Sequence, residues 1–253
     1  MLSANRPTRF LPALAALVLL AFGAVQAAPT GLVPYSAEYK IKISVLSGQL
    51  TARLIETGDG YVAVHKVTPT GMARMLVNGE IEETSGFAVD ESGVRPLRYQ
   101  SRDTMTKDKT DADFQFDWVA RSITGVVNGS PVTIDFDGRA HDRISIQYAM
   151  MRDMIVGAAD DSYLLFDIDK FKTLQITRIG TKEVEVPAGR YTAIGIRHQA
   201  EGSSRVTTLW CVPELDYLPA IIEQHRKGKL KMRATLERYV PESVQQPAAA
   251  QVN

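Results

Sequence analysis

The sequence predicts an all-β fold, mainly antiparallel, in which a curved and partly closed meandering or barrel-like sheet carries one main α-helix near residues 141–156. Three observations predict it: many short segments alternate apolar and polar residues, turn residues separate these segments at regular spacing, and one stretch has helical periodicity instead. Successive side chains of a strand point to opposite faces, so such alternation indicates a strand with one face on a core. Ten or more short strands favour a sheet that meanders and curls.

The composition is that of a folded protein without a strong net charge. The chain has 253 residues, of which 45% are hydrophobic and 23% charged, with 29 basic and 29 acidic side chains. A disordered chain would carry fewer apolar residues and a larger net charge. A formal net charge of +0 supplies no global field to attract phosphates, so we expect no nucleic-acid partner. The single Cys cannot form an internal disulfide.

The first residues have the features of a secretory signal peptide. Arg6 and Arg9 precede an uncharged, mostly apolar stretch at 10–25. Cleavage after Ala27 would leave small side chains at the two positions that signal peptidase inspects. We therefore expect a signal peptide at 1–27 and a periplasmic mature chain with no transmembrane segment. The alternative is a retained membrane anchor, although the stretch is shorter than the roughly 20 apolar residues that span a bilayer.

The alternating segments follow one another along most of the mature chain. They lie at 35–45, 50–56, 61–67, 112–118, 122–127, 132–136, 174–179, 182–186, 191–198, 205–212, 221–225 and 230–236. Gly48 is expected to interrupt the first strand. Asn128 and Gly129 are expected to form a two-residue hairpin turn, because both residue types accept a positive φ angle.

One segment, 141–156, has no Gly or Pro and repeats apolar residues at helical spacing. Its main apolar positions are Ile144, Tyr148, Met151 and Ile155. Asp142 is expected to cap the helix by accepting backbone N–H groups, and Gly157 to end it in a left-handed conformation. The helix either plugs one mouth of the sheet or packs across its concave face. Its methionines either fill the core or face a ligand.

The Gly and Pro residues are spread evenly as turn residues, and no linker is evident. We therefore expect a single β-rich domain at 28–240. The remaining segment, 241–253, has no periodicity and few charges, which favours a flexible C-terminal tail.

Two motifs stand out in the C-terminal half. The first is 181–194 with the turn Pro187-Ala188-Gly189, and the second is Leu209-Trp210-Cys211-Val212-Pro213 followed by Leu218-Pro219. Together with the segments 35–43, 96–99 and 142–145, they resemble the bacterial domain-of-unknown-function family 3108, over about residues 33–240. The resemblance implies an exported envelope protein of Gram-negative bacteria with a mostly β fold. It brings no established activity and therefore assigns no catalytic residue.

No catalytic, cofactor-binding or metal-binding residue is predicted, and no cofactor is expected. The four histidines are scattered without the short spacing that zinc sites need, and glycine-rich phosphate loops and Gly-x-Ser-x-Gly are missing. The acid pairs Asp111/Asp113, Asp135/Asp137 and Asp167/Asp169 are spaced so that both carboxylates share one strand face. Cys211 lies between strand neighbours and is expected to be buried and inert.

Two groups of residues are candidates for binding. Aromatic residues at Phe114, Phe116, Trp118, Phe136 and Trp210 line an apolar cavity inside the curled sheet, or alternatively fill the core. Basic residues at Lys229, Lys231 and Arg233 share one face of a predicted strand, where they meet anionic lipid head groups or envelope polysaccharide, or alternatively form a solvated face.

Two classes of function stay open. The first is a non-catalytic binding or cell-envelope maintenance module, which holds a lipid, glycolipid or other hydrophobic ligand or docks an envelope protein at a sheet edge. The alternative is a hydrolase that acts on envelope polysaccharide or peptidoglycan through paired carboxylates. The many amphipathic strands and the missing catalytic motifs favour the first class. The sequence does not predict the oligomeric state.

Overall fold

The computed structural model of the chain describes residues 31–107 and 109–242. The predicted signal peptide at 1–27 lies outside the described residues, as does most of the predicted tail. Pro241, which we expected in the tail, is the last residue of a strand and pairs with Tyr35, because the final strand is longer than its alternating part.

The described chain is mostly strand, with two helices and one short 3-10 turn. The strands are β1 (Tyr35–Ile43), β2 (Leu46–Thr57), β3 (Gly60–Thr70), β4 (Ile81–Asp90), β5 (Gly93–Asp103), β6 (Asp111–Asp117), β7 (Ser122–Val127), β8 (Ser130–Asp135), β9 (Ala140–His141), β10 (Ser162–Phe166), β11 (Phe171–Val186), β12 (Gly189–Ala200), β13 (Arg205–Val212), β14 (Leu218–Arg226) and β15 (Lys229–Pro241). The helices are α1 (Ala73–Leu76) and α2 (Ser145–Ile155), and the turn is η1 (Pro213–Leu215).

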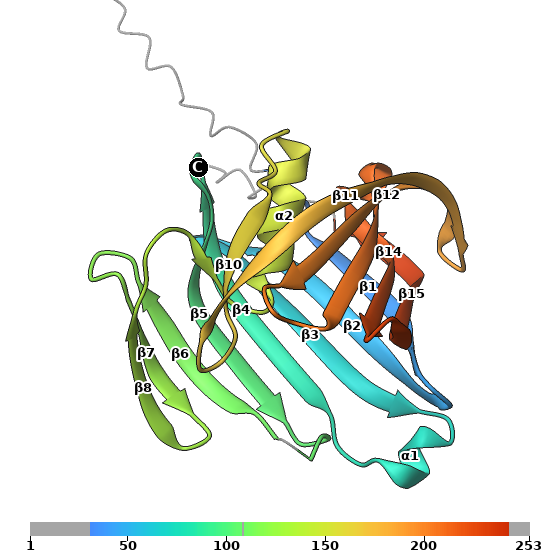
Figure 1. Ribbon diagram of the computed structural model, residues 1–253, viewed down its shortest axis with the longest axis horizontal. Helices are drawn as coiled ribbons and strands as arrows, with labels where there is room; N and C mark the ends of the chain where they lie inside the picture. The colour runs from blue at the N-terminus through green and yellow to red at the C-terminus, as the bar shows by residue number, and fades with distance from the viewer. Residues whose placement is uncertain (1–30, 108, 243–253) are drawn as a thin grey trace, which may run out of the picture.

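All these strands form one 15-stranded sheet, in the order β8-β7-β6-β5-β4-β3-β2-β1-β15-β14-β13-β12-β11-β10-β9. Neighbouring strands are antiparallel except β9 and β10, which are parallel, so the sheet is mixed. The sheet curls around α2 until β9 contacts β5, while β6, β7 and β8 extend beyond that contact (Figure 1). Its two edge strands, β8 and β9, are not hydrogen-bonded to each other. The predicted class, a mostly β fold with a curved and partly closed sheet, is confirmed.

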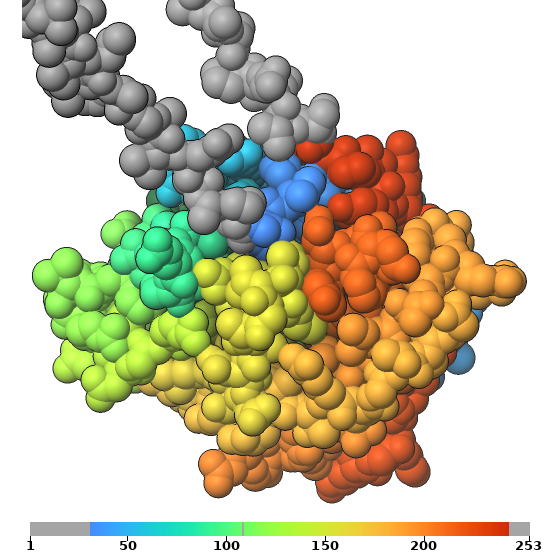
Figure 2. Space-filling view, turned by 90° about the horizontal axis from the view of Figure 1, so that it is seen from above, coloured from blue at the N-terminus to red at the C-terminus, as the bar shows by residue number. Residues whose placement is uncertain are grey.

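The helix α2 lies on the concave face of the sheet and contacts β4 and β5. In the view from above, the yellow residues of α2 lie near the centre of the face that is seen (Figure 2). Met150 and Met151 are buried, so these methionines pack in the core. The predicted helix began too early, because His141 belongs to β9. Gly157 ends the helix with a φ angle of 73°, as expected.

The connection between the first two strands differs from the prediction. The strand β1 ends at Ile43, and the turn is made by Ser44 and Val45, with a φ angle of 56° at Ser44. Gly48, which we expected to interrupt the strand, lies inside β2. A Cβ atom there would be 3.1 Å from the carbonyl oxygen of Thr68. The glycine is therefore explained by close packing of two strands and not by a turn.

Two long strands, β4 and β5, lie outside the predicted segments. They pair with each other, and the positions that face the core include Glu83, Ser85, Ser101 and Asp103. Polar residues on the inner face remove the apolar alternation by which a strand is recognised. The two segments predicted at 174–179 and 182–186 are a single strand, β11, with a register shift between Arg178 and Thr181.

Candidate ligand-binding site

Four of the five predicted aromatic residues form one cluster around β6. Ring centroids are 5.8 Å apart for Phe114 and Phe116, 6.0 Å for Phe116 and Phe136, and 5.1 Å for Trp118 and Phe136. The Trp118 indole N–H donates a hydrogen bond to the carbonyl oxygen of Pro96 at 2.7 Å. Phe136 borders an open cavity of about 300 Å³ together with Arg121 and Asp135. None of the four residues lines the three cavities described below.

Trp210 lies apart from that cluster. The ammonium nitrogen of Lys182 is 3.6 Å from the centroid of the Trp210 ring, and the indole N–H points to a carboxylate oxygen of Glu223 at 3.4 Å. Its strand neighbour Cys211 is buried, and burial raises the pKa of this thiol to about 12, in keeping with the expected inert cysteine.

The predicted basic patch lies at the hairpin between β14 and β15. Lys229 and Lys231 are exposed, but Arg233 forms an ion pair with Glu223 at 3.2 Å. A register shift between Gln224 and His225 leaves Lys231 as an additional residue of β15. Such a bulge interrupts the alternation of faces on which the prediction of one shared face rested.

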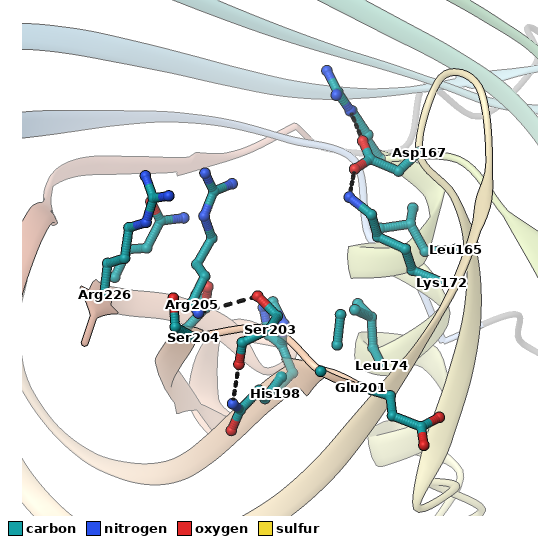
Figure 3. A pocket seen from close by; sticks show the side chains of 16 residues that line it. Leu165, Asp167, Lys172, Leu174, His198, Glu201, Ser203, Ser204, Arg205 and Arg226 are labelled. Atoms are coloured by element: carbon teal, nitrogen blue, oxygen red, sulfur yellow. Dashed lines mark hydrogen bonds and ion pairs between the residues drawn. The ribbon is translucent and has the colours of Figure 1, made fainter. Parts of the chain in front are cut away.

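A cavity of about 620 Å³ opens between the ends of β10 to β14 (Figure 3). Basic side chains outnumber acidic ones in its lining, with four (Arg143, Lys172, Arg205 and Arg226) against two (Asp167 and Glu201). Arg205 and Arg226 extend side by side into the cavity, and Asp167 and Lys172 lie on the opposite side (Figure 3).

The strand register explains how the polar residues reach this cavity. On the inner face, His198 of β12 pairs with Thr207 of β13, which pairs with Gln224 of β14. Two residues further toward the end of the strands, Arg205 pairs with Arg226. Burial lowers the pKa of His198 to about 4, so this imidazole is neutral near pH 7.

Arg205 and Arg226 are like charges at directly opposite positions, an arrangement that destabilises a sheet. Neither side chain has an ion pair or a hydrogen bond to another residue within the described part of the chain. An anion between the two guanidinium groups would remove the repulsion and satisfy their donors. The pair is therefore the strongest sign of ligand binding in the cavity.

The opposite wall holds a network of paired charges. Arg143, just before α2, contacts Asp167 at 2.5 Å and Glu83 of β4 at 3.7 Å. Lys172 also donates to Asp167, and the Tyr99 hydroxyl donates to Glu83. Burial alone would raise the pKa of the Asp167 carboxyl, but the hydrogen bond from Lys172 and the charge of Arg143 outweigh it and hold the pKa below its usual value.

Asp142 fixes the position of Arg143. Its buried carboxylate accepts hydrogen bonds from the Ser85 hydroxyl at 2.7 Å and from the backbone N–H groups of Ile144 and Ser145 at 2.8 Å each. Burial raises the pKa of this carboxyl to about 6, against the effect of these hydrogen bonds. The expected cap is therefore present, and it also ties the helix to β4.

A second cavity, of about 270 Å³, is apolar and lies at the same end of the strands. It is lined mainly by apolar side chains, including Ile41, Ile43, Leu46, Val67, Pro69 and Met105. The register connects the two cavities, because Gln224 pairs with Met232, and the next residue, Arg233, pairs with Lys42. Met232 therefore lies between the polar cavity and Ile43.

A third and smaller cavity, of about 80 Å³, lies beside Met150 and Met154 of α2.

The acid pairs offer little for proton transfer. Asp113 receives two hydrogen bonds from Arg98, at 2.9 and 2.6 Å, which hold its pKa below the usual value. Asp167 is held by Arg143 and Lys172. Carboxylates in ion pairs stay ionised and are poor proton donors at neutral pH. Among the described residues, no group of three His, Cys, Asp or Glu side chains could hold a metal ion.

Sequence reasoning missed most of this site. The predicted binding residues include none of Arg143, Lys172, His198, Arg205 and Arg226. Neither Arg205 nor Arg226 is conspicuous alone, since each stands at the end of an ordinary strand. Their juxtaposition depends on the register of β13 and β14, which shifts between Trp210 and Cys211.

The fold and the cavities define a class of protein: a mostly β protein with one large curled sheet and an open end lined by polar and apolar walls. The chain belongs to the DUF3108 family of proteins of unknown function, whose family profile matches residues 34–235. Within residues 31–107 and 109–242, no helix is long and apolar enough to cross a membrane.

Two bacterial proteins are among the solved structures that are similar to this chain. The first is a beta-barrel-like protein of domain of unknown function DUF1849 from Brucella abortus, with a TM-score of 0.59 and 12% identity over 84% of this chain and 99% of that chain. This likeness shows the fold alone. The second is a candidate exported protein with a YmcC-like fold from Bacteroides fragilis, with a TM-score of 0.32 and 12% identity over 83% of this chain and 96% of that chain. No protein of curated function matches the chain.

Proposed function

We propose that this protein is an exported, periplasmic binding module for an amphipathic molecule with an anionic head group and a hydrocarbon chain, such as an envelope lipid or glycolipid. The observation that carries the proposal is the pair of facing arginines, Arg205 and Arg226, at the mouth of the 620 Å³ cavity. A phosphate or carboxylate between the two guanidinium groups accepts charge-assisted hydrogen bonds from both.

The apolar cavity supports a hydrocarbon chain as the second part of the ligand. Its lining of Ile41, Ile43, Leu46 and Val67 offers an apolar surface, and Met232 lies between it and the arginines. Met is flexible enough to pack against chains of different shape. Burial of each CH₂ group contributes about 0.8 kcal/mol, so affinity depends on chain length.

A hydrolase fits these residues less well. Glycoside hydrolysis needs one carboxylic acid with a raised pKa near the scissile bond. Two acids come together beside Arg143, Glu83 from β4 and Asp167 from the turn after β10, and both contact Arg143. The pKa of Asp167 lies below its usual value. Asp142 has a raised pKa but is fully buried against Ser85.

Calorimetric titration with dodecyl phosphate, kept below its micelle-forming concentration, tests the proposal. The variant Arg205→Gln/Arg226→Gln removes both cations, and we expect binding to weaken by at least about a hundredfold, since each charge-assisted hydrogen bond contributes about 1.5–3 kcal/mol. The same variant should be slightly more stable than the wild type without ligand, because the like-charge pair is gone.

The matched control is Arg190→Gln/Arg238→Gln, which also removes two positive charges, from exposed positions outside the cavity. This control should bind dodecyl phosphate as the wild type does. Butyl phosphate should bind more weakly than dodecyl phosphate. Equal affinity in all three proteins would contradict the proposal.

Native mass spectrometry with solvent extraction identifies the natural ligand. The protein is purified from the periplasm of its own host, and denaturation should release a stoichiometric lipid or glycolipid with an anionic head group. A bare protein mass, together with no binding of dodecyl phosphate, would overturn the proposal.

A further inference from the structure

An exposed apolar cluster lies at one end of the molecule, where α1 projects beyond the sheet (Figure 1). We call it the apolar tip. Its members are Ile43 (52% exposed), Val45 (92%), Met72 (75%), Met75 (75%) and Leu76 (73%). They come from two turns that the sheet places side by side: the β1–β2 turn and the connection between β3 and β4.

The local structure leaves these side chains no place in the core. The helix α1 has only four residues, and Ala73 is its one buried residue. The turn at Ser44 and Val45 has a left-handed residue and lies beyond the last pair of the hairpin, Ile43 with Leu46. Scattered apolar residues on a surface are ordinary, but a contiguous group of large ones indicates an interaction site.

The apolar tip is surrounded by basic residues. Lys42, Arg74, Lys107 and Lys109 are exposed in the turns and strand ends around it. In the part of the chain that the structure describes, none of these four takes part in an ion pair. The exposed Lys229 and Lys231 lie at the same end, because Arg233 two residues further on pairs with Lys42.

Three acidic groups at this end have partners of their own. Against the effect of burial, hydrogen bonds and the field of Lys109 lower the pKa of one of them, Asp103. Glu80 and Glu82 pair with Lys66 at 2.9 and 3.6 Å. The Asp103 carboxylate accepts hydrogen bonds from the backbone N–H groups of Met105 and Thr106 at 2.8 and 2.9 Å. The surface that the apolar tip offers to a partner is therefore apolar at its centre, and at its rim the exposed Lys42, Arg74 and Lys107 have no acidic partner among the described residues.

We propose that the apolar tip docks onto a bilayer surface that contains anionic lipids. The apolar side chains of the β1–β2 turn and α1 enter the interfacial region, and Lys42, Arg74, Lys107 and Lys109 contact the head groups. Apolar burial together with attraction to anionic lipids is the combination that holds peripheral proteins at membranes. A second copy of the chain fits less well, because two tips face to face would bring their basic rims together.

Docking at this end points both cavities toward the membrane. The apolar cavity is lined by Ile43, a member of the apolar tip, and the polar cavity opens at the same ends of the strands. This membrane surface does not depend on the proposed ligand binding, and the two are tested separately.

Flotation with lipid vesicles tests the docking. The protein is produced from its full sequence in a bacterial host and purified after export. We expect it to float with vesicles of phosphatidylcholine and phosphatidylglycerol, and to float much less with phosphatidylcholine alone. The variant Val45→Ser/Met75→Ser/Leu76→Ser should bind the anionic vesicles at least about tenfold more weakly, because it loses most of the apolar area that enters the interface.

Val119→Ser is the matched control, since Val119 is 96% exposed and lies in the turn between β6 and β7. It should float as the wild type does. Equal flotation of wild type and tip variant would overturn the proposal, as would equal binding to vesicles with and without phosphatidylglycerol. A dimer that sedimentation detects in the wild type and not in the tip variant would also overturn it, in favour of a second copy.

Two further measurements show whether the tip variant is folded and whether the apolar tip enters the bilayer. Circular dichroism and thermal unfolding show whether the tip variant is folded, and Met75→Trp reports insertion in an otherwise intact tip. Its added tryptophan fluorescence should shift to the blue on anionic vesicles, whereas that of Val119→Trp should not. The tip variant should still bind dodecyl phosphate, so a failure of docking is distinguishable from a failure of the proposed function.

Discussion

Asp142 is the residue on which the position of the main helix depends. It accepts three hydrogen bonds, two from the start of α2 and one from Ser85 in the sheet. We expect Asp142→Ala to lower the free energy of unfolding by about 2–4 kcal/mol, because the cap is lost and buried donors are left unpaired. Urea unfolding measures the difference.

Asp135→Ala is the control for that substitution, since Asp135 is exposed at the end of β8. It should change the free energy of unfolding by no more than about 0.5 kcal/mol. If Asp142→Ala were as mild as this control, the helix would be held by its apolar face alone.

At the scale of single residues, the sequence predicted local contacts and missed distant ones. The cap at Asp142 was predictable, because an acid just before an apolar helical segment usually accepts its first N–H groups. Its partner Ser85 was not, since 57 residues separate the two. The same holds for Arg205 and Arg226, whose effect on each other exists only once β13 and β14 are paired.

At the scale of elements, β7 shows how a strand is fitted to its neighbour. A Cβ atom on Gly125 would be 2.2 Å from the carbonyl oxygen of Asp113 and 2.5 Å from the Cα of Phe114. Because both atoms are backbone, they cannot move without distorting β6. We expect Gly125→Ala to lower the free energy of unfolding by about 1–3 kcal/mol, the cost of overpacking. Thermal unfolding measures it.

Gly86→Ala is the comparison, because Gly86 is also inside a strand, yet a Cβ atom there would meet nothing within 4 Å. This substitution should be neutral or stabilising by a few tenths of a kcal/mol, since alanine restricts the unfolded chain. If both variants lost the same free energy of unfolding, the need for glycine at position 125 would come from backbone freedom and not from the close contact with β6.

Period-two alternation identified strands where one face is apolar. It found β6 and β13, and it predicted the two-residue turn at Asn128 and Gly129, where both φ angles are positive. It missed β4 and β5, because Glu83 and Ser101 face inward. One of the inward-facing polar residues that remove the apolar alternation is Glu83, which contacts Arg143 near the candidate site.

At the scale of the whole molecule, His141 lies where the curled sheet nearly meets itself. It belongs to β9, which contacts β5, and it is only 3% exposed. Burial, and to a smaller extent the charge of Arg139, lower the pKa of His141 to about 3, and its ring lies 6.1 Å from that of Tyr163. The folded protein therefore keeps this imidazole neutral in mildly acidic solution.

Because the pKa of His141 is lower in the folded protein, the free energy of unfolding decreases as the pH is lowered. Below pH 6.5 the unfolded chain binds a proton at His141 that the folded chain does not, so unfolding is favoured progressively until the folded-state pKa near 3 is reached. When the pH is lowered from about 7 to about 4, the free energy of unfolding of the wild type should decrease by about 3 kcal/mol more than that of His141→Phe. Urea unfolding at both pH values checks this. Parallel losses in the two proteins would show that His141 does not carry the effect.

The sequence alone predicts the mostly β class, the helix at its one interruption, most turns and the family of the chain. These depend on local patterns, because face alternation, caps and turn residues act over a few positions. The tertiary structure alone brings together residues that are distant in the sequence: the facing arginines, the apolar wall behind Met232 and the exposed apolar tip. Their placement follows from strand register and from the curl of the sheet, and a shift of one residue in register exchanges the two faces of a strand.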